Sequence, residues 1–122
     1  MPKYSLFKLT SLLHQDNTIK AILELNKNSD IFKGHFPGHP ILPGACMLQM
    51  VKEVMGSAFQ VPYRLKKADY LKFLKIIDPE NNSILQLTIS YRSIDSDNIH
   101  IIANLVADET TCFKFQGSYI IE

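Results

Sequence analysis

One segment rich in proline and glycine, GHFPGHPILPG at residues 34–44, joins a titratable side chain to the start of a helix. Its three glycines and three prolines indicate a rigid, tightly turned loop. His35 lies in this loop, and an imidazole titrates near neutral pH, so it is suited to take a proton next to a carbonyl group. The following helix would begin with free backbone N–H groups, the first after Pro43 being that of Gly44. Such donors can stabilise an oxyanion, so the segment predicts thioester chemistry.

The residues after this loop have the period of a helix. From Pro43, which suits a first helical turn, to about Ser57, apolar side chains dominate. The polar positions form one narrow stripe: Gln49, Lys52, Glu53 and Ser57, with Gly56 beside them. We therefore expect this helix to be mostly buried.

Most of the remaining chain alternates apolar and polar residues, as half-buried strands do. The predicted strands cover residues 4–14, 18–26, 65–77, 85–91, 99–105 and 113–119, and the pattern is least clean in 65–77. Short turns join most of them, which favours an antiparallel sheet. We predict a single α+β domain over residues 1–122, with about six strands wrapped around one long central helix.

Length and composition agree with one globular domain. The chain has 122 residues and a net charge of +1, so no strong field favours nucleic acid or a membrane surface. We expect no signal peptide and no transmembrane helix, and we interpret the two cysteines as free thiols in a cytoplasmic protein.

The 34–44 segment resembles the signature loop of the small bacterial 3-hydroxyacyl-acyl-carrier-protein dehydratases, which are hotdog-fold proteins. The order of elements is similar too, and KKADYLKFLKIIDP loosely resembles the family's strand after the helix. The resemblance implies a dehydratase that converts a 3-hydroxyacyl thioester to a trans-2-enoyl thioester. It implies no metal or organic cofactor, because the phosphopantetheine arrives as part of the substrate, carried by acyl carrier protein or coenzyme A.

The chain departs from that family at one catalytic position. The family has a glutamate or aspartate fourteen residues after the histidine, where this chain has Gln49, and often a glutamine one turn later, where it has Glu53. Residues i and i+4 share a helix face, with Cβ atoms about 5–6 Å apart. Either Glu53 supplies the carboxylate, or Gln49 positions a water or hydroxyl while His35 makes both proton transfers. A buried Glu53 would need a partner, with Lys52 or His35 as candidates.

The resemblance thus implies His35, Gln49 and Glu53 as catalytic residues, and Gly44, Pro43 and Phe36 as substrate-binding residues. It also implies a homodimer paired through strand edges, with a higher oligomer or a heterodimer left open. Two other functions stay open: a hotdog acyl thioesterase, and a catalytically degenerate acyl-binding or partner subunit.

Several other residues have competing interpretations. Cys46, in the first helical turn, could be a nucleophile but is more simply core packing. Met47, Met50 and Met55 could line an acyl tunnel or belong to the core. A basic stretch could dock an acidic carrier protein or protect a strand edge; it comprises Arg64, Lys66, Lys67, Lys72 and Lys75. We assign no special role to His14, His39 and His100, and expect no zinc site.

Overall fold

A computed structural model describes residues 6–29, 31–32 and 41–122 of the chain. His35, Phe36 and His39 lie outside the described residues. The elements follow in the order β1 (Phe7–Gln15), β2 (Thr18–Leu25), α2 (Gly44–Phe59), β3 (Tyr63–Phe73), β4 (Ile84–Ser93), β5 (Asn98–Ala107) and β6 (Thr110–Ile121).

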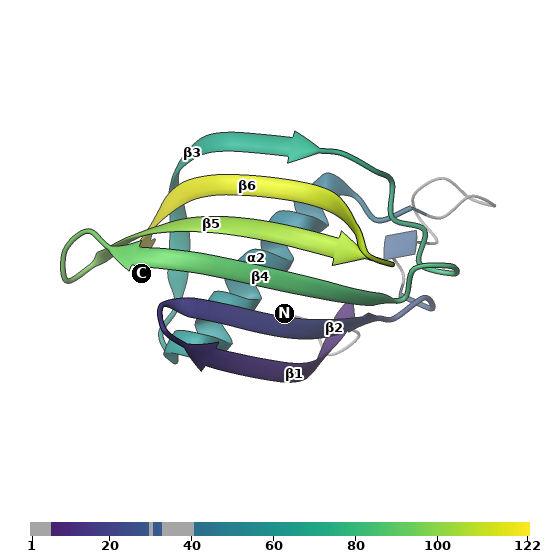
Figure 1. The fold of residues 1–122 in the computed structure, drawn as a ribbon, viewed down its shortest axis with the longest axis horizontal. Helices are drawn as coiled ribbons and strands as arrows, with labels where there is room; N and C mark the ends of the chain where they lie inside the picture. Colours follow the sequence, from purple (N-terminus) through teal and green to yellow (C-terminus); the bar gives the residue numbers. More distant parts are fainter. Residues whose placement is uncertain (1–5, 30, 33–40) are drawn as a thin grey trace.

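The strands form one antiparallel sheet of six strands in the order β1-β2-β4-β5-β6-β3. Figure 1 shows the sheet curving in front of helix α2, with β1 and β3 at its two edges. β3 follows the helix in sequence but pairs with the last strand, β6, so the chain crosses to the far edge before the β4–β6 meander. This arrangement confirms the predicted α+β fold of about six strands and one central helix.

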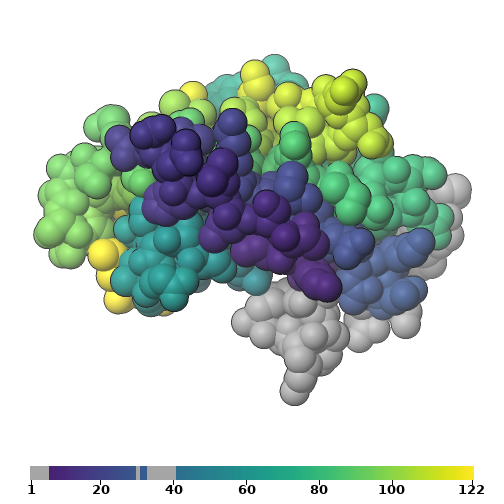
Figure 2. All heavy atoms as spheres, turned by 60° about the horizontal axis from the view of Figure 1, so that its bottom comes forward, coloured from purple at the N-terminus to yellow at the C-terminus, as the bar shows by residue number. Residues whose placement is uncertain are grey.

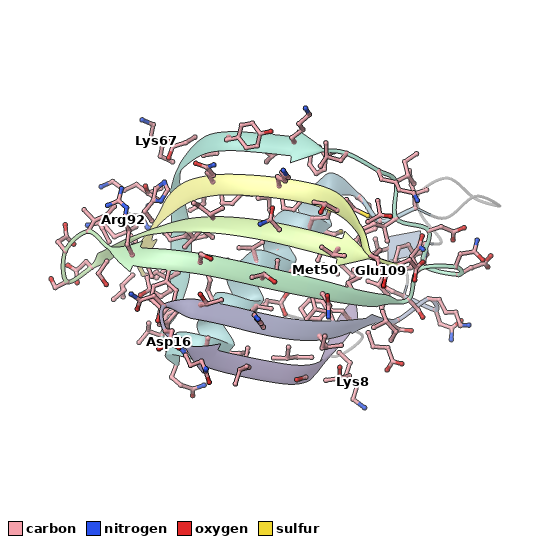
Figure 3. All side chains as sticks on the ribbon, viewed as in Figure 1. Lys8, Asp16, Met50, Lys67, Arg92 and Glu109 are labelled. Carbon is pink, nitrogen blue, oxygen red and sulfur yellow. The ribbon has the colours of Figure 1, made fainter. Side chains whose placement is uncertain are left out.

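The core lies between the sheet and the helix. Alternate residues of β2, β4, β5 and β6 are buried, as the period of two predicts. From the helix, the side chains of Met50, Val51, Val54 and Met55 are fully buried. Met50 lies at the centre, behind the sheet, whereas the charged side chains of Lys67 and Arg92 project at its periphery (Figure 3). The helix therefore serves as the inner layer of a two-layer domain.

Helix α2 begins one residue later than expected. Pro43 has an extended conformation, with φ −65° and ψ 148°, and is the N-cap, so Gly44 is the first helical residue. The helix continues past Ser57 to Phe59 because Ala58 and Phe59 still pack against the core. Gln60 ends it in the left-handed conformation, with φ 60°, and its N–H donates to the Gly56 carbonyl at 2.9 Å.

Strand β3 differs most from the prediction. It covers Tyr63–Phe73 instead of 65–77, and almost all of it is exposed because it is an edge strand. Its register against β6 shifts twice. One shift lies beside Gly117, where a Cβ would approach the Lys67 carbonyl oxygen to 2.6 Å, so a glycine allows the close approach.

The C-terminal end of α2 packs against the N-terminal strand. Figure 2 shows the teal helix end against the purple strand β1. The Phe59 ring lies 5.1 Å from the His14 ring and 4.9 Å from the Tyr91 ring, both edge-on.

Among the described residues, no helix has the length and apolarity needed to cross a membrane.

Candidate functional site

The N-terminus of helix α2 opens on an apolar cavity of about 400 Å³. Three pieces of chain line it: the segment before the helix, the first helical turn, and the end of β3 with the residues that follow. The lining residues are Ile41, Leu42, Pro43, Gly44, Met47, Phe73, Leu74, Lys75 and Ile76. Two predicted substrate-binding residues, Pro43 and Gly44, thus border the same hollow.

Backbone hydrogen bonds hold these walls together. The Leu42 N–H donates to the Ile77 carbonyl at 2.9 Å, which fixes the segment before the helix to the segment after β3. The Leu74 N–H donates to the Cys112 carbonyl at 2.8 Å, which ties the end of β3 to β6. Residues 74–77 therefore turn towards the helix instead of extending the strand, and this turn creates the cavity.

Gly44 is the first helical residue, so its N–H has no acceptor within the helix and points towards the N-terminal end. This is the donor that we expected to stabilise an oxyanion. The ring of Phe73 lies directly beside it: a Cβ at position 44 would be 2.7 Å from the Phe73 Cε1 atom. An aromatic wall therefore stands next to the predicted donor, a feature that sequence reasoning missed.

Gln49 and Glu53 meet on one face of the helix, as their spacing predicts. The Gln49 Nε2 atom donates a hydrogen bond to Glu53 Oε2 at 3.2 Å. Gln49 is exposed and Glu53 is half-buried. Lys52, one of the candidate partners for Glu53, instead forms an ion pair with Glu122 at 3.1 Å.

Distance along the helix separates the roles of these two side chains. At about 1.5 Å per residue, Gln49 lies roughly 7.5 Å from Gly44 along the axis, and Glu53 roughly 13.5 Å. The amide is therefore closer to the oxyanion donor than the carboxylate. Because one amide N–H bonds to Glu53, the amide oxygen and the second N–H remain available to a ligand hydroxyl.

The helix methionines divide between cavity and core. Met47 lines the cavity, whereas Met50 and Met55 are fully buried in the core, so the tunnel interpretation applies at most to Met47. Cys46 is half-buried, and burial raises the pKa of its thiol. Desolvation disfavours the thiolate, which argues against a nucleophile.

The remaining candidate residues lie away from the cavity. His14 is in strand β1, and its Nε2 atom is 2.6 Å from the Tyr91 hydroxyl. His100 Nε2 is 3.5 Å from Asp69 Oδ2. Across the described ranges, no group of three His, Cys, Asp or Glu side chains is placed to hold a metal ion.

The basic stretch lies on edge strand β3 and just beyond it, and all five of its cations are exposed. Lys66 donates to Asn98 Oδ1 at 3.2 Å, and Lys67 lies 3.5 Å from Asp69 Oδ1. Lys75 lines the cavity. This placement fits both edge protection and docking of an acidic partner.

A protein-family model described as ApeI-like, ApeI dehydratase, matches residues 11–115. Among curated proteins, the 3-hydroxyacyl-acyl-carrier-protein dehydratase FabZ of Wolbachia pipientis wMel is 36% identical over 80 residues, which are 59% of this chain and 55% of that protein. FabZ of Verminephrobacter eiseniae (strain EF01-2) is 34% identical over 87 residues, 63% of this chain and 58% of that protein. The chain thus spans little more than half the length of these relatives.

Two solved structures share the fold. A chain of the dehydratase heterocomplex ApeI:P from Xenorhabdus doucetiae superimposes with a TM-score of 0.74 at 19% identity, covering 93% of this chain and 97% of that one. A putative thioesterase, yhdA from Lactococcus lactis, gives a TM-score of 0.72 at 12% identity, covering 99% and 98%. At these identities the likeness confirms the predicted hotdog fold and carries no argument about chemistry.

Proposed function

The chain belongs to the ApeI-like dehydratase family, and from this premise we propose that it removes water from a 3-hydroxyacyl thioester to give a trans-2-enoyl thioester. One observation carries the proposal in geometric terms: the first helical residue, Gly44, borders an apolar cavity of about 400 Å³. A hollow of this kind suits an acyl thioester whose carbonyl oxygen faces the helix N-terminus.

In the proposed reaction, His35 removes a proton from the carbon next to the thioester carbonyl. The Gly44 N–H and the helix dipole stabilise the negative charge that develops on the carbonyl oxygen. The bond between C3 and its hydroxyl then breaks, and the hydroxyl leaves as water once it receives a proton. No metal or organic cofactor is required, since the phosphopantetheine belongs to the substrate.

The residue at position 49 affects the step in which the leaving hydroxyl receives a proton. A carboxamide is not an acid, so Gln49 can orient the hydroxyl but not protonate it. We assign the proton to His35, which carries it after the first step. Glu53 then acts through Gln49: its carboxylate accepts the amide N–H and fixes the orientation of the amide. Glu53 is therefore a positioning residue in this scheme.

A homodimer paired through β3 is part of the proposal. Leu65, Leu71 and Phe73 lie on the same sheet face as the core, because their partners on β6 are buried: Tyr119, Phe115 and Phe113. Nevertheless they are 40%, 38% and 50% exposed. An edge strand with an uncovered apolar face favours a second subunit at that edge.

We further propose that the substrate arrives on an acyl carrier protein or coenzyme A, with the exposed cation Lys75 at the cavity attracting the anionic carrier. The heterodimer and the higher oligomer remain alternatives to the homodimer. The cytoplasmic location inferred from the sequence stays a prediction.

The proposal is tested in the hydration direction, by following loss of the enoyl absorbance of crotonyl and longer trans-2-enoyl thioesters. We expect activity that His35→Ala abolishes and that His39→Ala, a change in the same loop, preserves. Release of free thiol without hydration would instead indicate the thioesterase. Absence of both reactions in a folded protein would indicate the degenerate binding subunit.

A further inference from the structure

We infer that Phe73 determines the acyl-chain length that this protein accepts, because its ring closes the apolar cavity beside the first residue of helix α2. The inference rests on the proposed function in one respect, that the ligand is an acyl thioester. It concerns a residue that lies outside the loop and helix that carry the proposed chemistry.

The ring of Phe73 is held in place from two sides. On one side it stacks on Phe113, with ring centroids 5.1 Å apart and an interplanar angle of 26°. Phe113 is fully buried and stacks in turn on Phe115, with centroids 6.4 Å apart. On the other side the ring reaches the Gly44 backbone so closely that a Cβ there would lie 2.7 Å from Cε1. The ring therefore bridges the sheet and the helix N-terminus.

Several of the other residues that line the cavity are fixed by the core or by backbone hydrogen bonds. Leu42 and Met47 are buried in the core, and backbone hydrogen bonds fix the Leu42–Ile77 and Leu74–Cys112 pairs. Ile76, 64% exposed, lies at the rim. Phe73 combines a position next to the proposed oxyanion donor with a half-exposed side chain at the end of an edge strand, where a change in its size leaves the backbone hydrogen bonds of the other walls in place. It is thus the wall whose size sets how far an acyl chain extends past the thioester.

Binding of acyl thioesters of increasing chain length tests whether Phe73 limits the length of the bound acyl chain. Each methylene buried in an apolar site strengthens binding by about fourfold, until the chain meets an obstruction. In the wild type, affinity for saturated acyl-coenzyme A thioesters from butyryl to dodecanoyl should therefore rise with chain length up to a certain length. We call the length beyond which affinity no longer rises the break. Saturated thioesters cannot be hydrated, so this readout is independent of dehydratase activity.

We expect Phe73→Ala to move the break to longer chains, so that at least the next methylene adds about fourfold. Phe73→Trp should move it to shorter chains, and Phe73→Leu should fall between the wild type and Phe73→Ala. Leu65→Ala is the matched control: it lies on the same strand and the same sheet face, is 40% exposed and does not line the cavity, so it should leave the break unchanged. Circular dichroism, thermal unfolding and native mass would show whether each variant keeps the fold and assembly of the wild type.

The outcomes separate this inference from the proposed function. A break that stays at the same length in folded Phe73→Ala and Phe73→Trp would overturn the inference even if hydration activity is present. A break that moves with the size of residue 73 in a protein without hydration activity would support the inference and refute the dehydratase. Absence of any acyl thioester binding would overturn both.

Discussion

The Gln49 amide donates to the Glu53 carboxylate at 3.2 Å, one helical turn apart on the same face of α2. The carboxylate thus holds the amide, and the amide lies closer than the carboxylate to the helix N-terminus. A neutral hydrogen-bonding group therefore occupies position 49, where the resemblance to 3-hydroxyacyl-acyl-carrier-protein dehydratases implies an acid. Variants at the two positions can show which side chain orients the hydroxyl and whether either one acts as an acid.

Glu53→Gln separates a positioning role from an acid role. If Glu53 only orients Gln49, the change should lower kcat by less than about tenfold, and the shape of the pH–rate profile should remain. Loss of a general acid would instead lower the rate by about 10²–10⁴ and remove one limb of the profile.

Gln49→Ala is the companion variant, and we expect it to lower kcat more than Glu53→Gln because it deletes the group that meets the hydroxyl. Gln49→Glu should restore an acid at this position and raise the rate above that of the wild type. Full activity in Gln49→Ala would contradict the orienting role.

The contact between Gly44 and Phe73 makes a prediction about stability. Gly44→Ala should lower the free energy of unfolding by about 1 kcal/mol, because the ring must leave its preferred rotamer. In the Phe73→Ala background the same change should be neutral or stabilising, since the clash is gone and alanine favours a helix over glycine. Urea unfolding of the wild type, the two single variants and the double variant gives the coupling free energy between positions 44 and 73 directly. Equal effects in both backgrounds would argue that the ring does not contact residue 44 in solution.

Much of the fold follows from local periodicity. The stripe around Met50 and Val54 specified a buried helix, and alternation at Leu85–Tyr91 specified a strand with one buried face. Strand β3 gave a weak signal for a physical reason: at the sheet edge, both of its faces are largely exposed, so no alternation marks its ends. The turn at residues 74–77 depends on hydrogen bonds to distant partners, Leu42 and Cys112, that no local pattern reveals.

The site was predictable where it is local in sequence. The i, i+4 spacing placed Gln49 and Glu53 on one face, and the proline before Gly44 marked the helix start. Phe73 was missed because it meets Gly44 only through the sheet topology, which brings the end of β3 across to the helix N-terminus. The assignment of His35 stays a prediction, since it lies outside the described residues.

The proposed dimer edge can be tested with two neighbouring residues of β3. Leu71 and Tyr70 are 38% and 43% exposed, but they point to opposite faces of the sheet, since Leu71 pairs with buried Phe115 and Tyr70 with Gln116. Leu71→Glu would place a charge on the uncovered apolar face and should shift the native mass from dimer to monomer. Tyr70→Glu should leave the mass unchanged. A monomeric wild type, or equal effects of the two changes, would refute the proposed edge.

Tyr119 predicts how stability falls at alkaline pH. Burial raises the pKa of its hydroxyl from an ordinary value of 10.0 to about 12. Below about pH 10 the group is neutral in both states and has no effect. Between about pH 10 and 12 the unfolded chain releases this proton and the folded protein does not, so stability should fall by up to roughly 3 kcal/mol.

Two measurements check this. Burial and the neighbouring Tyr91 also raise the pKa of Tyr63, so tyrosinate absorbance should show more than one late-titrating group in the folded protein. Tyr119→Phe should remove the component that titrates near pH 12. Denaturant unfolding of Tyr119→Phe between pH 9 and pH 12, a range chosen to span the expected pKa, should show a shallower loss of stability. An identical slope in the variant would mean that other groups govern the alkaline limit.

Thiol alkylation tests whether Cys46 is reactive. Because burial raises the pKa of its thiol, the thiolate fraction at neutral pH is smaller than that of an ordinary cysteine, and labelling by iodoacetamide should be slow. The rate should increase as pH rises above the ordinary thiol pKa, and Cys46→Ala should abolish the faster labelling phase. Cys112 should react more slowly still, since it is buried and its Sγ atom donates to the Thr110 carbonyl at 3.4 Å. Hydration activity that survives Cys46→Ala would agree with a packing role, whereas rapid labelling at neutral pH together with lost activity would return this cysteine to the list of catalytic candidates.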